Sequence, residues 1–287
     1  MHLFTSNSKN KYFFVWLIVT TVIVFALYGL IIFFIPKSDD GPDQYQTNVL
    51  KAQRYMFGDN EYDYVMVGSS KANRVTIQDV NNQCYNLAFS GSSSFTGLEI
   101  IKEKSENSGI YPKIIFVEID NSLINGIDDD IIDKVSGKYQ YKINQSEYRI
   151  DFAIYSLTKF IFYQINGEKT IYDHPKIESS IEFWQRAKSV LEDEDIILSY
   201  LSGVKEYVDY FEAHGTRVIL LELPNDESLY DSVQCVQIRE LAMEIFSEDI
   251  YEWYMVEWGN YTVSDGIHLG QYSGLVYAQE LIQKYIN

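Results

Sequence analysis

The sequence has little cysteine, little histidine and a shortage of basic residues. Its 287 residues include 2 cysteines, 4 histidines, and 23 lysines and arginines against 41 acidic residues, for a net charge of −18. Two cysteines are too few for the disulfide framework of a small secreted domain, although a single bond between Cys84 and Cys235 stays open. A strongly negative protein repels phosphate backbones, which argues against nucleic acid as a partner.

Motifs for metals and nucleotides are also missing. The sequence contains neither C-x-x-C nor H-E-x-x-H, so it gives no support to a zinc site, and we expect no metal and no cofactor. No glycine-rich phosphate loop follows any apolar run, which argues against a nucleotide-binding sheet. The three aspartates at 128–130 lack the alternating ligands and the glycine of a calcium loop, and the first turn of a helix explains them better.

One segment near the N-terminus has no charge at all. Tyr12 to Ile35 form an apolar run that would be about 36 Å long as a helix, enough to cross a hydrocarbon core of about 30 Å. Lys9 and Lys11 precede the run, so the positive-inside rule places residues 1–11 in the cytoplasm and everything after the run outside the cell. A cleaved signal peptide is the alternative, but it has a shorter apolar region and a small-residue cleavage site. The sequence therefore predicts a single-pass anchor over 12–35.

The rest of the chain has the pattern of an α/β domain. Residues 36–60 are polar and are expected to form a linker with a short helix around Val49–Met56, and 61–287 to form one extracytoplasmic domain. Short, nearly continuous apolar runs, typical of buried parallel strands, alternate with helical patterns. We therefore predict a three-layer, flavodoxin-like parallel sheet with helices on both faces. The runs begin at Tyr64, Cys84, Ile114 and Val218.

The stretch from about 122 to 193 breaks this alternation and is expected to form a helical insertion over one side of the sheet. It holds an aromatic run near Tyr148–Tyr163 and also Trp184. These aromatic side chains either bind a substrate or partner or pack into the core. Core packing is the more typical role, because aromatic stripes on helices usually face inward.

Two local patterns could carry chemistry. Ser70 lies on the turn that follows the first strand, where the N-terminus of the next helix favours developing negative charge, although serine is also a common helix cap. Asp265 and His268 lie three residues apart just before the last helix. Histidine is a general base near neutral pH, and a carboxylate can fix its tautomer. A turn with a surface histidine is the alternative to this pair.

Together these patterns resemble the SGNH/GDSL hydrolase superfamily. The serine turn 68–70 and the Asp265–His268 pair match its first and last motif blocks, Asn86-Leu87-Ala88-Phe89-Ser90-Gly91 is similar to its second, and Asn121 follows the third strand as in its third. The resemblance implies a catalytic triad of Ser70, His268 and Asp265. It also implies an oxyanion hole formed by the N–H groups of Ser70 and Gly91 and by the side chain of Asn121.

The chain departs from the family in two blocks. The usual G-D-S is Gly68-Ser69-Ser70 here, and the usual G-x-N-D is reduced to Asp120-Asn121-Ser122. A G-S-S turn after an N-terminal anchor is similar to membrane-anchored proteins of the bacterial cell envelope, among them proteins of teichoic-acid D-alanylation and polysaccharide O-acetylation. These proteins share the spacing of Ser70 and Arg74, so Arg74 is a candidate substrate-binding residue, with a solvated helix position as the alternative.

Two functions fit this resemblance. The first is a membrane-anchored serine esterase or O-acyltransferase that acts on acyl esters of envelope glycans, polymers or lipid-linked substrates. The second is a non-catalytic envelope protein that holds an acyl carrier or a glycan for a partner membrane acyltransferase. The distance between the Ser70 hydroxyl and the His268 ring discriminates between them, because a nucleophile and its base must come within hydrogen-bond reach.

Overall fold

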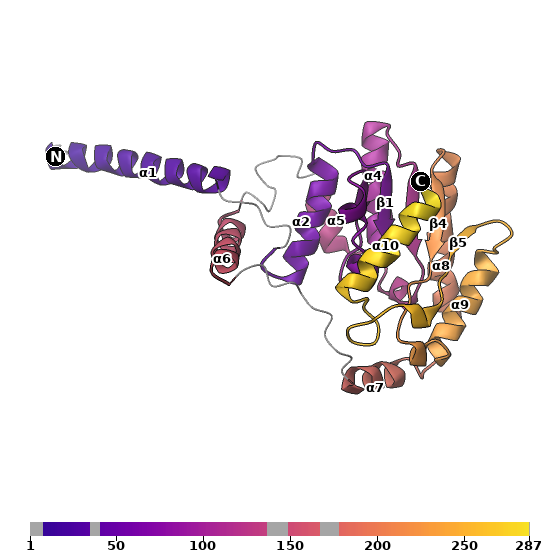
Figure 1. Ribbon diagram of the computed structural model, residues 1–287. Coiled ribbons are helices and arrows are strands. Elements are labelled where there is room, and N and C mark those ends of the chain that lie inside the picture. Colours follow the sequence, from indigo (N-terminus) through magenta and orange to yellow (C-terminus); the bar gives the residue numbers. More distant parts are fainter. Residues whose placement is uncertain (1–7, 35–40, 137–148, 167–177, 287) are drawn as a thin grey trace, which may run out of the picture.

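The computed structural model describes residues 8–34, 41–136, 149–166 and 178–286. Figure 1 shows a long helix, α1 (Ser8–Phe34), that projects away from an α/β domain. This helix is long and apolar enough to cross a membrane, and its described side chains are exposed along most of its length. The site described below belongs entirely to the α/β domain.

A five-stranded parallel sheet forms the centre of that domain. Its strand order is β2-β1-β3-β4-β5, which is the order of flavodoxin-like folds and confirms the predicted class. The four predicted runs supply the first four strands, whereas the fifth is an edge strand that sequence reasoning missed. The strands are β1 (Tyr64–Val67), β2 (Cys84–Asn86), β3 (Ile114–Glu118), β4 (Arg217–Leu221) and β5 (Glu252–Tyr254).

Helices cover both faces of the sheet, and alternate strand residues point to opposite layers. Val65 and Val67 of β1 pack into one cluster with α2 (Gln44–Phe57), α4 (Ser94–Ser108), α8 (Glu194–Ala213) and α9 (Val233–Ile245). Met66, between them in the sequence, packs into the other cluster with α3 (Ile77–Val80) and α10 (Gln271–Tyr285). This period of two is the geometry of a strand that is buried on both sides.

The helix expected around Val49–Met56 in the predicted linker is present as the longer helix α2, which packs on the domain. Asp43 caps α2 by accepting a hydrogen bond from the N–H of Gln46, at 2.8 Å, and Leu50 and Ala52 are buried. The polar side chains of Asn48 and Gln53 are buried as well. The polar composition that predicted a linker therefore includes two buried side chains of a packed helix, while Asp43, Gln44, Asp59 and Asn60 are exposed.

The expected insertion contains three described helices. The first, α5 (Asp129–Val135), has Asp128 as its cap and two aspartates in its first turn, which confirms the helix-start interpretation of the acidic run. The second, α6 (Ile150–Asn166), corrects the expectation of core packing, because most of its large apolar side chains are exposed. The third, α7 (Glu178–Ala187), lies at the lower end of the domain in Figure 1.

Both cysteines are free thiols. Cys84 is buried at the start of β2, and Cys235 is partly buried on α9. The bond that the sequence left open between them is therefore not formed.

Candidate active site

Ser70, Asp265 and His268 come together beyond the carboxyl ends of the strands. Ser70 lies on the turn after β1, and the other two lie in the loop before α10. The Nε2 atom of His268 is 2.7 Å from Oγ of Ser70, and its Nδ1 atom is 2.7 Å from Oδ2 of Asp265. With Nδ1 donating to the carboxylate, Nε2 accepts the hydroxyl proton of Ser70, which is the arrangement of a nucleophile and its oriented base.

The loop around Asp265 is built to hold this carboxylate. Its Oδ1 atom accepts hydrogen bonds from the backbone N–H groups of Ile267 at 3.2 Å and His268 at 2.9 Å. Gly266 makes the tight turn possible with a φ of +100°, a left-handed value that side chains other than glycine rarely adopt. Burial alone would raise the pKa of Asp265, but its hydrogen bonds with His268 and Ile267 outweigh this effect and lower the pKa to about 2. The carboxylate is therefore ionised at neutral pH.

A cleft of about 180 Å³ opens in front of Ser70. Gly91 lines the cleft together with Ser70, so the structure places two of the three expected oxyanion donors at one site. The side chain of Asn121 lies outside the described part of the chain, although its backbone begins a short 3₁₀ turn directly after β3. Arg74 is exposed and is not among the residues that line the cleft.

Helix α2 holds the loop that carries Gly91. Gln44 and Asn48 donate side-chain hydrogen bonds to the carbonyl of Ser90 at 2.9 and 2.8 Å, and Lys51 donates to the carbonyl of Ala88 at 2.8 Å. A Cβ atom on Gly91 would lie 2.8 Å from Nε2 of Gln44. The segment that follows α1 thus fixes the position of one of the expected oxyanion donors.

We predict that Gly91→Ala disables the site more than it destabilises the fold. Gly91 has a φ of +79°, where a side chain costs about 1–2 kcal/mol, and its new Cβ would push against Gln44 beside the cleft. Gly109, with a φ of +73° and open space around it at the end of α4, is the matched control. The melting temperature should fall by a similar amount in Gly91→Ala and Gly109→Ala, whereas the rate of ester turnover should fall at least tenfold in Gly91→Ala alone. Equal turnover in the two variants would contradict this prediction.

Three charged side chains are buried directly behind the serine turn. Lys71 lies 3.3 Å from Oδ2 of Asp120 and 3.9 Å from Oε1 of Glu118. The other oxygen of Glu118 accepts a hydrogen bond from the N–H of Ser69 at 2.6 Å, and it occupies the space that a Cβ atom on Gly68 would need. Gly68 is therefore required because the carboxylate of Glu118 packs against the backbone of this turn.

Burial sets the ionisation of this cluster. Burial and the neighbouring Asp120 raise the pKa of Glu118 to about 8, against the opposing effect of Lys71. Burial alone would raise the pKa of Asp120, but Lys71 and hydrogen bonds from Ser122 outweigh this effect and lower it. Burial alone would lower the pKa of Lys71, but Asp120 and Glu118 outweigh this effect and raise it. The favoured form at neutral pH is a Lys71–Asp120 ion pair beside a protonated Glu118, which leaves these three side chains without net charge.

We predict that the wild type becomes less stable as pH rises from 5 to 8 and that Glu118→Gln abolishes this dependence on pH. The folded protein keeps the Glu118 proton up to a pKa of about 8, whereas the unfolded chain releases it near the ordinary glutamate pKa of 4.5. The unfolded state thus binds fewer protons in this range, so stability falls as pH rises. Melting temperatures at several pH values should show Glu118→Gln gaining on the wild type as pH increases. A pH-independent difference would contradict the raised pKa.

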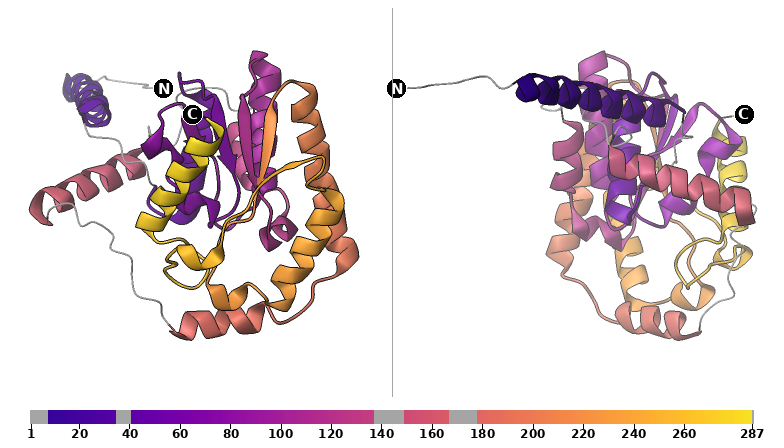
Figure 2. Two further views of the ribbon diagram at one scale, coloured as in Figure 1. Left: turned by 45° about the vertical axis from the view of Figure 1, so that its right-hand side comes forward. Right: turned by 90° about the vertical axis from the view of Figure 1, so that its left-hand side faces the viewer.

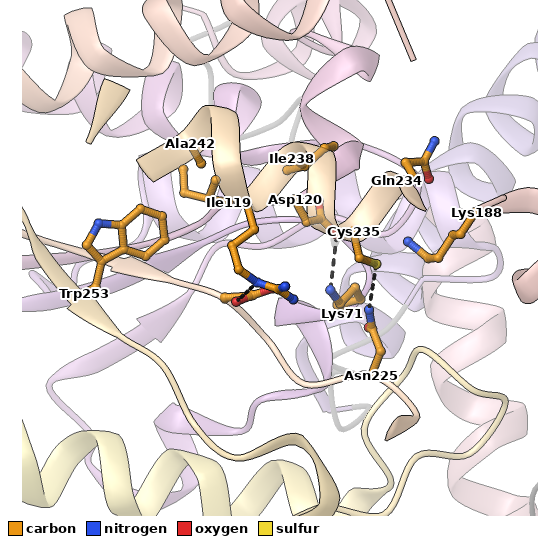
Figure 3. Close-up of a pocket in the computed structure, with 12 residues that line it drawn as sticks. Lys71, Ile119, Asp120, Lys188, Asn225, Gln234, Cys235, Ile238, Ala242 and Trp253 are labelled. Carbon is orange, nitrogen blue, oxygen red and sulfur yellow. Dashed lines mark hydrogen bonds and ion pairs between the residues drawn. The ribbon is translucent and has the colours of Figure 1, made fainter. Parts of the chain in front are cut away.

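Sequence reasoning missed several residues around the site. A second cavity, of about 30 Å³, lies behind the cleft and shares Lys71, Asp120 and Lys188 with it (Figure 3). Asn225, which follows β4, also lines this cavity, and its buried Oδ1 atom has no hydrogen-bond partner within the described residues. The rule that sites follow strand ends would have indicated Asn225. Trp184 of α7 also lines the cleft, which agrees with the binding alternative for the aromatic side chains of the insertion rather than with core packing.

Within the described ranges, no group of three or more His, Cys, Asp or Glu side chains could hold a metal ion. His214 lies exposed at the end of α8, and the two remaining histidines, His2 and His174, fall outside the described residues. His268 is therefore the one described histidine at the carboxyl edge of the sheet.

No protein-family model and no curated protein matches the chain. Among solved structures, a GDSL-like lipase from Bacteroides thetaiotaomicron is similar over 77% of this chain and 85% of its own, with 12% identity and a TM-score of 0.39. A protein assigned as an acylhydrolase from Bacteroides fragilis is similar over 83% of this chain and 94% of its own, with 15% identity and a TM-score of 0.41. At such scores these similarities carry no argument of their own, and the chain itself presents a flavodoxin-like parallel sheet with Ser70, His268 and Asp265 joined beyond its strands.

Proposed function

We propose that the protein is a membrane-anchored serine esterase or O-acyltransferase of the SGNH type. The observation that carries this proposal is the hydrogen-bonded series from Oγ of Ser70 through the His268 ring to Asp265, with both contacts at 2.7 Å. A protein that only bound its ligand would have no need of this contact, so the geometry supports catalysis over the binding-only alternative.

The arrangement can perform ester chemistry in two steps. Oγ of Ser70 attacks the acyl carbon while Nε2 of His268 takes the hydroxyl proton, and the N–H groups of Ser70 and Gly91 stabilise the oxyanion. The imidazolium then gives this proton to the leaving alkoxide, which departs as an alcohol and leaves an acyl-serine. Water, or a hydroxyl of a second substrate, then attacks the acyl-serine while its proton passes to His268. The imidazolium returns this proton to Oγ of Ser70 as the acyl–serine bond breaks, which releases the acid or the new ester.

The proposed location follows from α1. Lys9 and Lys11 on its N-terminal side favour a cytoplasmic N-terminus, which would place the α/β domain on the outer surface of the cell. Acyl esters of envelope glycans, polymers or lipid-linked intermediates are the substrates available there. A membrane-bound acyltransferase is a candidate partner as a source of acyl groups.

Labelling of the full-length protein with a serine-directed fluorophosphonate tests the proposal. The reagent should react with the wild type and not with Ser70→Ala. Ser69→Ala is the matched control, because the Ser69 hydroxyl accepts a hydrogen bond from the N–H of Lys71 rather than facing the base. Labelling that persists in Ser70→Ala, or that never occurs in the folded wild type, would refute a serine hydrolase.

A further inference from the structure

Helix α6 carries a stripe of exposed aliphatic side chains along its whole length. The stripe repeats at positions i, i+4, i+7, i+11 and i+15, so its members share one face of the helix. They are 37% to 75% exposed, although a stripe of this kind is normally buried. The members are Ile150, Ile154, Leu157, Ile161 and Ile165.

Apart from Ile150, which borders α1, the stripe has no hydrophobic partner within the described part of the fold. Neither hydrophobic cluster of the domain includes a residue of α6. Phe152, which lies on the side of the helix opposite the stripe, is buried, and so is Ala153 at one edge of the stripe. The helix therefore faces the protein with one side and presents an aliphatic surface outward with the other.

The position of α6 relates this surface to α1. The N-terminus of α6 lies against the C-terminal half of α1, where Val24, Phe25 and Tyr28 form a groove of about 640 Å³ with Arg149 and Ile150. In the left view of Figure 2, α1 is seen end-on while α6 is seen lengthwise, so the two helices run crosswise. If α1 crosses a bilayer, α6 lies along the plane of that bilayer.

We propose that α6 is an interfacial helix whose aliphatic stripe inserts into the outer surface of the lipid bilayer. The inference rests on the proposed anchoring by α1. Interfacial helices are buried about 5–10 Å into the headgroup and acyl boundary. Tyr28 and Val24 lie six and ten residues before the end of α1 at Phe34, which corresponds to about 9 and about 15 Å at about 1.5 Å per residue, so the outer end of the groove with α6 lies at this depth.

Arg149 supports lipid as the occupant. It lies at the start of α6 with an exposed side chain, where it is paired with Asp151 at 2.7 Å and within reach of phosphate headgroups. The stripe beyond it consists of aliphatic side chains alone, which suit acyl chains and offer no polar group for recognition of a protein partner. Two attachments, one spanning and one lying flat, would fix the orientation of the cleft with respect to the membrane.

Spin labelling of the full-length protein in phosphatidylcholine vesicles tests this proposal. A label is placed at Leu157→Cys in a Cys235→Ser background, and its accessibility to oxygen, which partitions into lipid, is compared with that to a water-soluble nickel complex. Ile196→Cys is the matched control, since Ile196 is an exposed aliphatic residue on α8, on the opposite side of the domain from α6 (Figure 1). We expect the oxygen-to-nickel ratio to be severalfold higher at 157 than at 196.

A third label, at Val24→Cys in α1, separates the two levels of the proposal. A lipid-exposed label at 24 with a water-exposed label at 157 would overturn the interfacial helix and leave the anchor intact. A water-exposed label at 24 would refute the anchor and, with it, the inference about α6. An immobile label at 157 that neither reagent reaches would mean that protein covers the stripe, which also overturns the proposal.

Discussion

Replacing His268 with alanine is expected to lower kcat/KM for an acetyl ester by about 10⁴-fold or more. Among the described residues, the imidazole is the one group hydrogen-bonded to Oγ of Ser70, at 2.7 Å, and its loss removes the base that would take the hydroxyl proton during attack. Alanine also leaves no group to return a proton to the departing alkoxide. Initial rates with p-nitrophenyl acetate and the full-length protein in detergent measure the effect.

His214→Ala is the matched control for this prediction. His214 is exposed, stacks on Tyr111 with the ring centroids 4.5 Å apart, and lies at the end of α8 away from the cleft. Its removal should leave the rate within about twofold, as is usual for surface substitutions away from a site. The double variant Ser70→Ala with His268→Ala should be no slower than either single variant, because the two groups act as a unit. A His268→Ala rate close to that of the wild type would show that another base serves Ser70.

Local sequence patterns singled out the three side chains that the structure brings together, because each part of this arrangement is encoded within a few residues. Ser70 follows a strand directly, and Asp265 and His268 form their contact within one turn. The parallel sheet then brings the two ends of the chain together, since sites in such folds lie beyond the carboxyl ends of the strands. The strands themselves were predictable because they are buried on both faces and so read as apolar runs.

The features that the sequence did not reveal depend on tertiary contacts. The edge strand β5 reads Glu252-Trp253-Tyr254, a mixed pattern that identifies it only through its pairing with β4. Helix α2 has a polar composition because Asn48 and Lys51 are hydrogen-bonded to the loop before Gly91. The burial of these polar groups is a property of the packed domain, and no pattern along the chain reports it.

The buried charges behind the serine turn lead to the second large effect. We expect Lys71→Met to lower the free energy of unfolding by about 3–5 kcal/mol, the usual cost of removing one partner from a buried ion pair. Lys71 is 8% exposed and lies between Asp120 and a fully buried Glu118, so its loss leaves the Asp120 carboxylate without its nearest cation. Urea-induced unfolding of the full-length protein in detergent, followed by tryptophan fluorescence, measures this change.

Two further variants distinguish the loss of a charge from the loss of packing. Lys113→Met removes an ion pair with Asp63 whose lysine side chain is 66% exposed, and it should cost no more than about 1 kcal/mol. Adding Asp120→Asn to Lys71→Met removes the stranded charge and should restore a large part of the lost stability. If the double variant is instead less stable than Lys71→Met, the lysine stabilises the turn through the packing of its aliphatic chain, and the ion pair contributes little.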